Sequence, residues 1–211
     1  MWLHLNDNDL GDSGVKQIST LLRNPDCKLQ TLWVDNCGLT DQSCATLASM
    51  LCKESSKLKH LDLSSNHIGD AGVLLLCSGL KSPNCTLETL SLSDCGVTGE
   101  GYAALAAALK SNPSSHLEEL DLRGNDPGDS GVMSLTDLLQ DPQCKLKRLR
   151  LLRSETAEKS CEYLTSVVGG NPLLLTEVDL TGKISGDSAV KQFCALLEDP
   201  HCRWKKLKLV I

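Results

Sequence analysis

The sequence predicts an α/β solenoid, a right-handed horseshoe with parallel strands on its concave face and helices on its convex face. Two observations lead to this fold class. Leucine or a close equivalent recurs at fixed offsets in a frame that returns every 29 or 30 residues, and each frame is followed by apolar residues at helical spacing. The frame runs through the whole chain, so residues 1–211 are expected to form a single domain of about seven repeats.

The frame is clearest in the third unit, where Leu58, Leu61, Leu63 and Asn66 hold its fixed positions. This is a leucine-rich-repeat pattern, and its long period predicts one strand and one full helix per repeat. The same positions are held elsewhere by Leu3, Leu5, Asn8; Leu29, Leu32, Val34, Cys37; Leu87, Leu90, Leu92, Cys95; Leu117, Leu120, Leu122, Asn125; Leu146, Leu149, Leu151; Leu175, Val178, Leu180; and Trp204, Leu207, Leu209.

The third unit also shows the order of elements within a repeat. Residues 58–63 alternate apolar and polar, which predicts a half-buried strand, and residues 64–66 turn the chain. A helix is then expected to begin near Gly69, with Asp70 as its N-cap. Its apolar positions, spaced to face the strand, are Val73, Leu76, Cys77 and Leu80. Because each helix returns the chain to the next strand, the strands should be parallel, with a helix after each of the first seven.

Two repeat types alternate along the chain. One carries Asn after its strand and Gly-Asp before its helix, and the other carries Cys followed by Gly and Thr. A buried Asn must satisfy backbone groups of the turns, and a thiol can replace it as a weak donor. The pattern weakens late, where Ser154 and Lys183 stand in place of Asn or Cys. The expected structural ladder consists of Asn8, Cys37, Asn66, Cys95 and Asn125.

Composition and motifs exclude several classes of function. The net charge of −6 argues against nucleic-acid binding, and no apolar run is long enough for a membrane helix. Ten of the eleven cysteines recur in repeat phase, which places them beyond disulfide reach, so reduced thiols in the cytoplasm are expected. No metal-ligand spacing, cofactor loop or catalytic constellation is present. The segment 11–14 (GDSG) resembles a protease motif, but it recurs in repeat phase as a turn with a helix start.

The strands predict two columns of side chains on the concave face. One column runs through Trp2, Thr31, His60, Thr89, Glu119, Arg148, Glu177 and Lys206, and the other through His4, Trp33, Asp62, Ser91, Asp121, Arg150, Asp179 and Lys208. The later positions alternate in sign, which indicates either a self-neutralising polar surface or a charged recognition face. Trp33 is either an exposed anchor for a protein partner or is packed on neighbouring strands. The candidate binding residues are therefore Trp33, His60, Asp62, His4, Arg148, Arg150, Asp121 and Glu119.

The alternating units N-x-L-G-D-x-G, as at residues 8–14, and C-G-L-T, as at residues 37–40, resemble the ribonuclease-inhibitor class of leucine-rich repeats. Within that class they resemble the carboxy-terminal repeat region of NACHT-containing NOD-like innate immune receptors. Residues 125–132 (NDPGDSGV), preceded by residues 111–114 (SNPS), are similar to the expanded fish branch of those receptors.

The resemblance implies a non-enzymatic module that binds a protein ligand or other domains of the same receptor, in sensing, autoinhibition or assembly. Because the chain begins within a strand and shows no capping repeat, it is expected to be a fragment of a larger protein. The alternative is a ribonuclease-inhibitor-like protein that holds an enzyme in its concave face. The mixed charges of the two columns count against that alternative, which would favour an acidic inner face.

Overall fold

The structure, a computed structural model, describes residues 1–22, 24, 26–151, 177–181 and 206–210. Short strands alternate with helices of three turns. The strands are β1 (Trp2–His4), β2 (Thr31–Trp33), β3 (His60–Asp62), β4 (Thr89–Ser91), β5 (Glu119–Asp121), β6 (Arg148–Arg150), β7 (Glu177–Thr181) and β8 (Lys206–Val210). The helices are α1 (Gly11–Leu22), α2 (Asp41–Leu51), α3 (Gly69–Leu80), α4 (Gly99–Lys110) and α5 (Gly128–Leu139).

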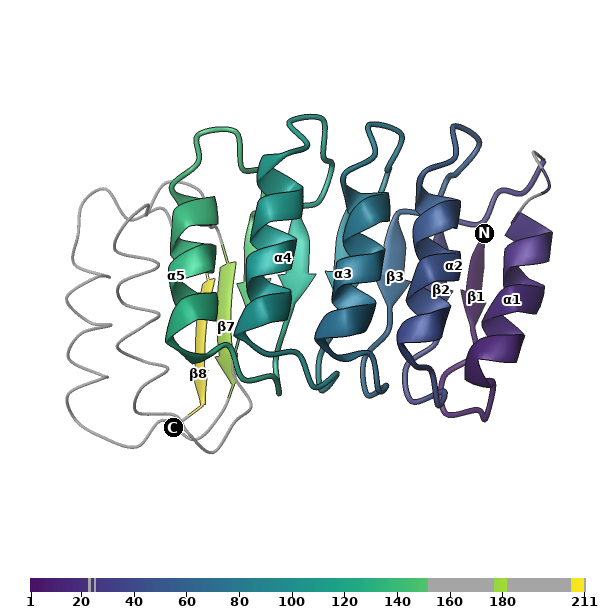
Figure 1. The fold of residues 1–211 in the computed structure, drawn as a ribbon, viewed down its shortest axis with the longest axis horizontal. Helices are drawn as coiled ribbons and strands as arrows, with labels where there is room; N and C mark the ends of the chain where they lie inside the picture. The colour runs from purple at the N-terminus through teal and green to yellow at the C-terminus, as the bar shows by residue number, and fades with distance from the viewer. Residues whose placement is uncertain (23, 25, 152–176, 182–205, 211) are drawn as a thin grey trace.

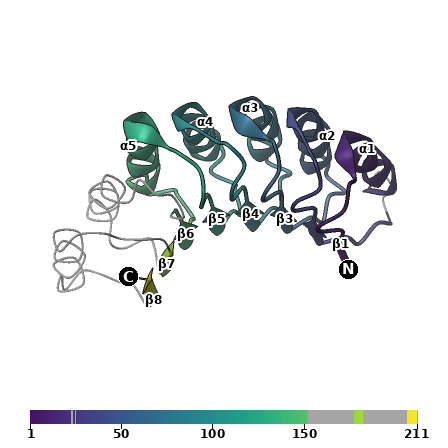
Figure 2. The ribbon, with the colours of Figure 1, turned by 90° about the horizontal axis from the view of Figure 1, so that it is seen from below.

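The eight strands form one parallel sheet in sequence order, from β1 at one edge to β8 at the other. Figure 1 shows α1 to α5 side by side in front of this sheet, and Figure 2 shows the strands on the inner side of an arc with the helices outside. The predicted α/β solenoid, with strands on the concave face and helices on the convex face, is confirmed. The helices expected after β6 and β7, and the ladder positions Ser154 and Lys183, lie outside the described residues.

The leucine frame sets the register of the sheet. Leu32 pairs with Leu61, Leu61 with Leu90, and Leu90 with Leu120 in the parallel ladders. These central strand residues are at most 1% exposed, and they pack against the buried helix residues Val15, Cys44, Val73, Tyr102 and Val132. Because the frame repeats with one strand per unit, each repeat stacks its leucines on those of its neighbour and extends one continuous core.

Asn66 joins the turns of two neighbouring repeats through five hydrogen bonds. Its Oδ1 accepts from the backbone N–H of Cys37 and Leu39, both at 3.0 Å. Its Nδ2 donates to the carbonyl of Val34 at 2.9 Å, and to two carbonyls of its own turn, on Leu63 and Ser64, at 2.8 and 3.1 Å. Asn125 repeats the arrangement, accepting from Cys95 and Val97. A single carboxamide therefore satisfies buried backbone groups of two turns at once.

In the alternate repeats a thiol takes the same position. The Sγ of Cys37 donates to the carbonyls of Leu5 and Asp35 at 3.0 and 3.3 Å. The Sγ of Cys95 likewise donates to the carbonyls of Leu63 and Ser93, at 3.1 and 3.4 Å. Asn8 differs from the expectation of a buried ladder, because it is exposed and donates only to Leu5 and Asn6 within its own turn. β1 is the edge strand of the sheet, so no neighbouring turn covers Asn8.

The expectation that Asp70 caps its own helix is wrong. The helix α3 begins after Ile68 without a side-chain cap, and Gly69 adopts a φ of 57° that favours glycine. The carboxylate of Asp70 instead reaches the start of the next helix, where it accepts from the N–H and hydroxyl of Thr98 at 2.8 and 2.5 Å. It also accepts from the N–H of Gly101 at 2.9 Å. The positive end of a helix dipole favours such a carboxylate.

Asp12 makes the corresponding contact one pair of repeats earlier. It accepts from the N–H and hydroxyl of Thr40 at 3.0 and 2.7 Å, and from the hydroxyl of Ser43. Thr40 is the residue that caps α2, since its side chain accepts from the N–H of Gln42. In these two Gly-Asp pairs the aspartate therefore positions the cap residue of the following helix.

The eight cysteines within the described residues are all free, and Cys161, Cys194 and Cys202 lie outside those residues. Burial raises the pKa of the Cys44 and Cys95 thiols to about 12 and that of Cys77 to about 11. Cys52, at the carboxyl end of α2, is exposed. Most of the described thiols thus serve as small apolar core residues.

Replacing Asn66 by alanine is expected to lower the free energy of unfolding by about 1–3 kcal/mol, because backbone groups of two turns would lose their partner. The matched variant is Asn8→Ala, which removes only two local bonds at an exposed position and should cost less than about 1 kcal/mol. Urea denaturation followed by circular dichroism measures both. Equal losses for the two variants would contradict the role assigned to Asn66.

Among the described cysteines, Cys52 is expected to react first with a thiol reagent added to the folded protein at pH 8. Cys44 and Cys95 should stay unmodified there, because they are buried and their raised pKa keeps them protonated. Peptide mapping by mass spectrometry after timed labelling gives the rate at each site, with Cys52→Ser as the control. In denaturant all eleven cysteines should react. Labelling of Cys44 as fast as Cys52 would show that the core is open.

Candidate functional site

In β2 to β6 a buried leucine lies between two residues of the predicted concave columns. In β2, for example, Leu32 is fully buried while Trp33 is 38% exposed. In β3, His60 and Asp62 are half-buried around Leu61. The parallel register places Trp33 opposite Asp62, so the two predicted columns run straight across the sheet. The candidate residues on β1 to β6 thus share one surface.

Three aromatic rings lie close together at the start of this surface, and two of them are stacked. The rings of His4 and Trp33 are parallel within 4°, with their centroids 3.9 Å apart. Trp2 lies beside His4, with centroids 5.0 Å apart and a tilt of 35°. Trp33 is therefore partly exposed and also packed on a neighbouring strand, while its role as an anchor for a protein partner stays a prediction. The stack fixes the indole while leaving part of it accessible.

An open groove crosses the concave face between Trp33 and the arginines of β6. Trp33 lies at one end of the groove, and Arg148 and Arg150 lie at the other end. The floor between them is made of shorter side chains from β3, β4 and the turns that follow, namely His60, Asp62, Ser64, Ser65, Thr89, Ser91, Ser93 and Asp94. The groove is thus aromatic at one end and hydroxyl-rich in the middle. Its other end is lined by charges of both signs, from Glu119, Asp121, Arg123, Arg148 and Arg150.

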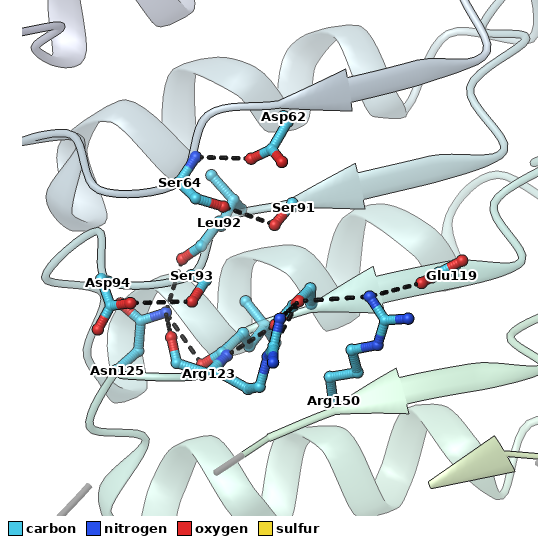
Figure 3. Close-up of polar contacts among 12 residues, drawn as sticks. Asp62, Ser64, Ser91, Leu92, Ser93, Asp94, Glu119, Arg123, Asn125 and Arg150 are labelled. Carbon is cyan, nitrogen blue, oxygen red and sulfur yellow. Dashed lines mark hydrogen bonds and ion pairs between the residues drawn. The ribbon is translucent and has the colours of Figure 1, made fainter. Parts of the chain in front are cut away.

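Hydrogen bonds hold the floor of the groove in place (Figure 3). The carboxylate of Asp62 accepts from the N–H of Ser64 at 2.9 Å. The hydroxyls of Ser64 and Ser91 are 2.6 Å apart, and the Nδ1 of His60 lies 3.1 Å from the hydroxyl of Thr89. These bonds link neighbouring strands and orient the polar groups before any partner binds.

The acidic candidates on β5 are buried beneath arginines. Glu119 is 8% exposed and Asp121 is 3% exposed. Glu119 forms ion pairs with Arg148 at 2.8 Å and with Arg150 at 2.9 Å. Asp121 pairs with Arg123 at 2.6 Å and lies 3.6 Å from Arg150. Figure 3 shows Arg150 reaching back over β5 to make these contacts. Buried carboxylates require such partners, because an unpaired charge in the interior is costly.

Sequence reasoning did not include Arg123, which completes this cluster. The guanidinium of Arg123 contacts both oxygens of Asp121, with Nε at 3.0 and 3.1 Å and Nη2 at 2.6 Å. Arg123 follows Glu119 and Asp121 at the same two-residue spacing, so extending the strand periodicity by one step would have found it. The cluster therefore consists of Glu119, Asp121, Arg123, Arg148 and Arg150.

The alternation of charge continues in the backbone register beyond β6. Arg148 pairs in register with Glu177, and Arg150 with Asp179. The next ladder sets Glu177 beside Lys206 and Asp179 beside Lys208. The side chains of β7 and β8 are not described, so their ion pairs stay a prediction.

Within the described residues, no group of three or more His, Cys, Asp or Glu side chains is arranged to hold a metal ion. In that same part of the chain no helix has the length and apolarity that crossing a membrane requires. Several polar groups of the groove are paired with one another by hydrogen bonds and ion pairs.

The chain matches one protein-family model and several known proteins. The model describes the PRAME C-terminal domain and matches residues 2–167. The chain is 42% identical over 207 residues to NACHT, LRR and PYD domains-containing protein 3 of Rattus norvegicus, covering 98% of the chain and 20% of that protein. It is 42% identical over 207 residues to human NACHT, LRR and PYD domains-containing protein 12, covering 98% of the chain and 19% of that protein.

A third relative, human NACHT, LRR and PYD domains-containing protein 14, is 41% identical over 210 residues, which is 100% of the chain and 19% of that protein. The chain thus spans about a fifth of the length of these relatives. The names of these relatives include LRR, for the leucine-rich repeat that the sequence pattern of this chain indicated, and NACHT, for a further domain of those proteins. The chain belongs to the family of the PRAME C-terminal domain, and it is related along its length to proteins that contain NACHT, LRR and PYD domains.

Proposed function

We propose that this chain is a non-enzymatic protein-recognition module of a cytoplasmic NOD-like innate immune receptor, and that its concave face binds a protein ligand or another domain of the same receptor. The observation that carries the proposal is the groove that begins at Trp33. It offers a fixed, partly exposed indole beside hydrogen-bonded polar groups. Fixed aromatic area of this kind is typical of residues that dominate protein interfaces.

The charges of the face support an anchor at Trp33 rather than at the arginines. Arg148 and Arg150 already form ion pairs with Glu119 at 2.8 and 2.9 Å. A partner that engages them must compete with these contacts. Trp33 needs no such exchange, because its accessible surface is already apolar and its rotamer is held by His4.

The proposal covers three roles, which are ligand sensing, autoinhibition and assembly. The relatives carry NACHT and PYD domains by name, so a domain of the parent receptor is one source of the partner. We assign the chain to the receptor type that the segment 125–132 resembles, the expanded fish branch. The candidate recognition surface is the same for each of the three roles.

A ribonuclease-inhibitor-like protein is the alternative function. Such a protein would favour an acidic concave face for a basic enzyme. Here Arg123, Arg148 and Arg150 neutralise the two carboxylates of β5, which disfavours this function.

Trp33→Ala is expected to weaken binding of a natural partner at least about tenfold, because the variant removes a preorganised aromatic contact. Arg150→Ala should weaken binding less than about threefold, since that guanidinium is engaged within the protein and partly exposed. Quantitative affinity capture from cell extract by the two variants and the wild-type chain makes the comparison. Dissociation constants of the captured proteins are then measured with purified components.

Leu74→Ser is the matched control, because Leu74 is 56% exposed on α3 of the convex face. Circular dichroism and the melting temperature establish that each variant is folded. Normal binding by Trp33→Ala together with loss of binding by Leu74→Ser would move the site to the convex face and overturn the proposal.

A further inference from the structure

The aromatic end of the groove has a geometry that selects the chemistry of its partner. One face of the Trp33 indole is covered by the His4 ring at 3.9 Å. The groove is lined by Trp33 but not by His4, so the indole meets the groove on the side away from His4. On that side the next residue in register is Asp62, one strand along.

Asp62 has a much shorter side chain than Trp33, and its carboxylate forms part of the groove floor. Neighbouring strands lie about 4.8 Å apart. A planar group that continued the stack from His4 and Trp33 by one more step would therefore lie against the indole and directly above the carboxylate of Asp62. The N–H of Ser64 holds that carboxylate from the side at 2.9 Å.

The electrostatics of this end favour a cation. In the two concave columns of β1 to β4, Asp62 is the one residue with a formal charge when histidine is neutral. Burial, followed by repulsion from Asp62 and Asp7, raises the pKa of the neighbouring Asp35 carboxyl above its ordinary value. The guanidinium groups of Arg123 and Arg150 are held at Asp121 on β5, two strands from Asp62, or about 10 Å. Both guanidinium groups are paired with carboxylates there, and at physiological ionic strength their remaining field is largely screened over that distance.

We propose that the Trp33–Asp62 pair binds an arginine side chain of the partner protein, with the guanidinium stacked on the indole and paired with the Asp62 carboxylate. This inference rests on the proposed function and names the chemistry of its partner. Arginine fits better than lysine, because its guanidinium is planar, stacks on aromatic faces and presents several N–H donors in one plane. His60 and Thr89, hydrogen-bonded beside Asp62, fix the neighbouring part of the groove floor.

The test uses three capped tripeptides, Gly-X-Gly, in which X is arginine, citrulline or lysine. Citrulline keeps the planar shape of arginine without its charge. Binding to the full 211-residue chain is followed through the indole N–H signals of its three tryptophans by NMR, and Trp33→Phe assigns the Trp33 signal. The arginine peptide should shift the Trp33 signal and bind about tenfold more tightly than the citrulline peptide. The lysine peptide should fall between the two.

Asp62→Asn should reduce arginine-peptide affinity to that of the citrulline peptide, since it removes the charge and keeps an oxygen that can accept from Ser64. The matched control is Glu100→Gln, which removes a carboxylate from the exposed start of α4 on the convex face and should bind the arginine peptide normally. Equal affinity for arginine and citrulline, equal affinity for arginine and lysine, or no effect of Asp62→Asn would each overturn the inference.

The outcome separates this inference from the function on which it rests. If Trp33→Ala abolishes partner capture but the arginine peptide shows no preference, the recognition function stands and the arginine assignment is wrong. If the arginine peptide binds as expected but Trp33→Ala captures its partner normally, the pocket chemistry stands and the proposed recognition function at this end is wrong.

Discussion

The turns in the described part of this solenoid depend on two buried carboxamides, those of Asn66 and Asn125. Asn66 and Asn125 each occupy a position where backbone N–H and carbonyl groups of two turns converge without water. A carboxamide can accept and donate at the same time, which neither a carboxylate nor a hydroxyl does with this geometry. The stacked leucines supply most of the buried apolar surface, but apolar contact does not fix the orientation of one turn on the next. The hydrogen bonds of Asn66 and Asn125 fix how each of these turns lies on its neighbour, and this orientation aligns the strands that the turns follow.

The two repeat types have different roles in these connections. An Asn-type repeat reaches back through its Asn to the preceding repeat and forward through its Gly-Asp aspartate to the following helix. A Cys-type repeat receives both contacts, through the backbone around Cys37 or Cys95 and through the capping threonine. The thiol suits this receiving role, because it needs only a weak bond to a carbonyl and takes little space. The recognition groove lies over this alternating scaffold and takes its straight columns from it.

Much of this arrangement could be predicted from the sequence, because it follows from spacing. The leucine frame predicted the parallel register, and the period-two alternation predicted which residues share the concave face. The role of Asp70 was misjudged, because cap preferences describe a helix and the residue just before it. In a solenoid, residues 28 positions apart are neighbours, and Thr98 stands at that distance from Asp70. The face-to-face contact of His4 with Trp33 depends on side-chain torsions that spacing does not determine. The depth of Glu119 and Asp121 depends on three long arginine side chains folding over them, which is also a matter of rotamers.

The aspartate contacts limit how such a chain can change its number of repeats. If one repeat were removed between α1 and α3, Asp12 would meet Gly69 and Gly72, which carry no hydroxyl, in place of Thr40 and Ser43. If two were removed, Asp12 would meet Thr98 and Gly101, the groups that Asp70 already binds. Duplication or loss of two repeats at a time therefore preserves these aspartate contacts. Duplication or loss of a single repeat would place an aspartate beside residues that carry no hydroxyl. The smallest unit that repeats these contacts is about 58 residues, two repeats long.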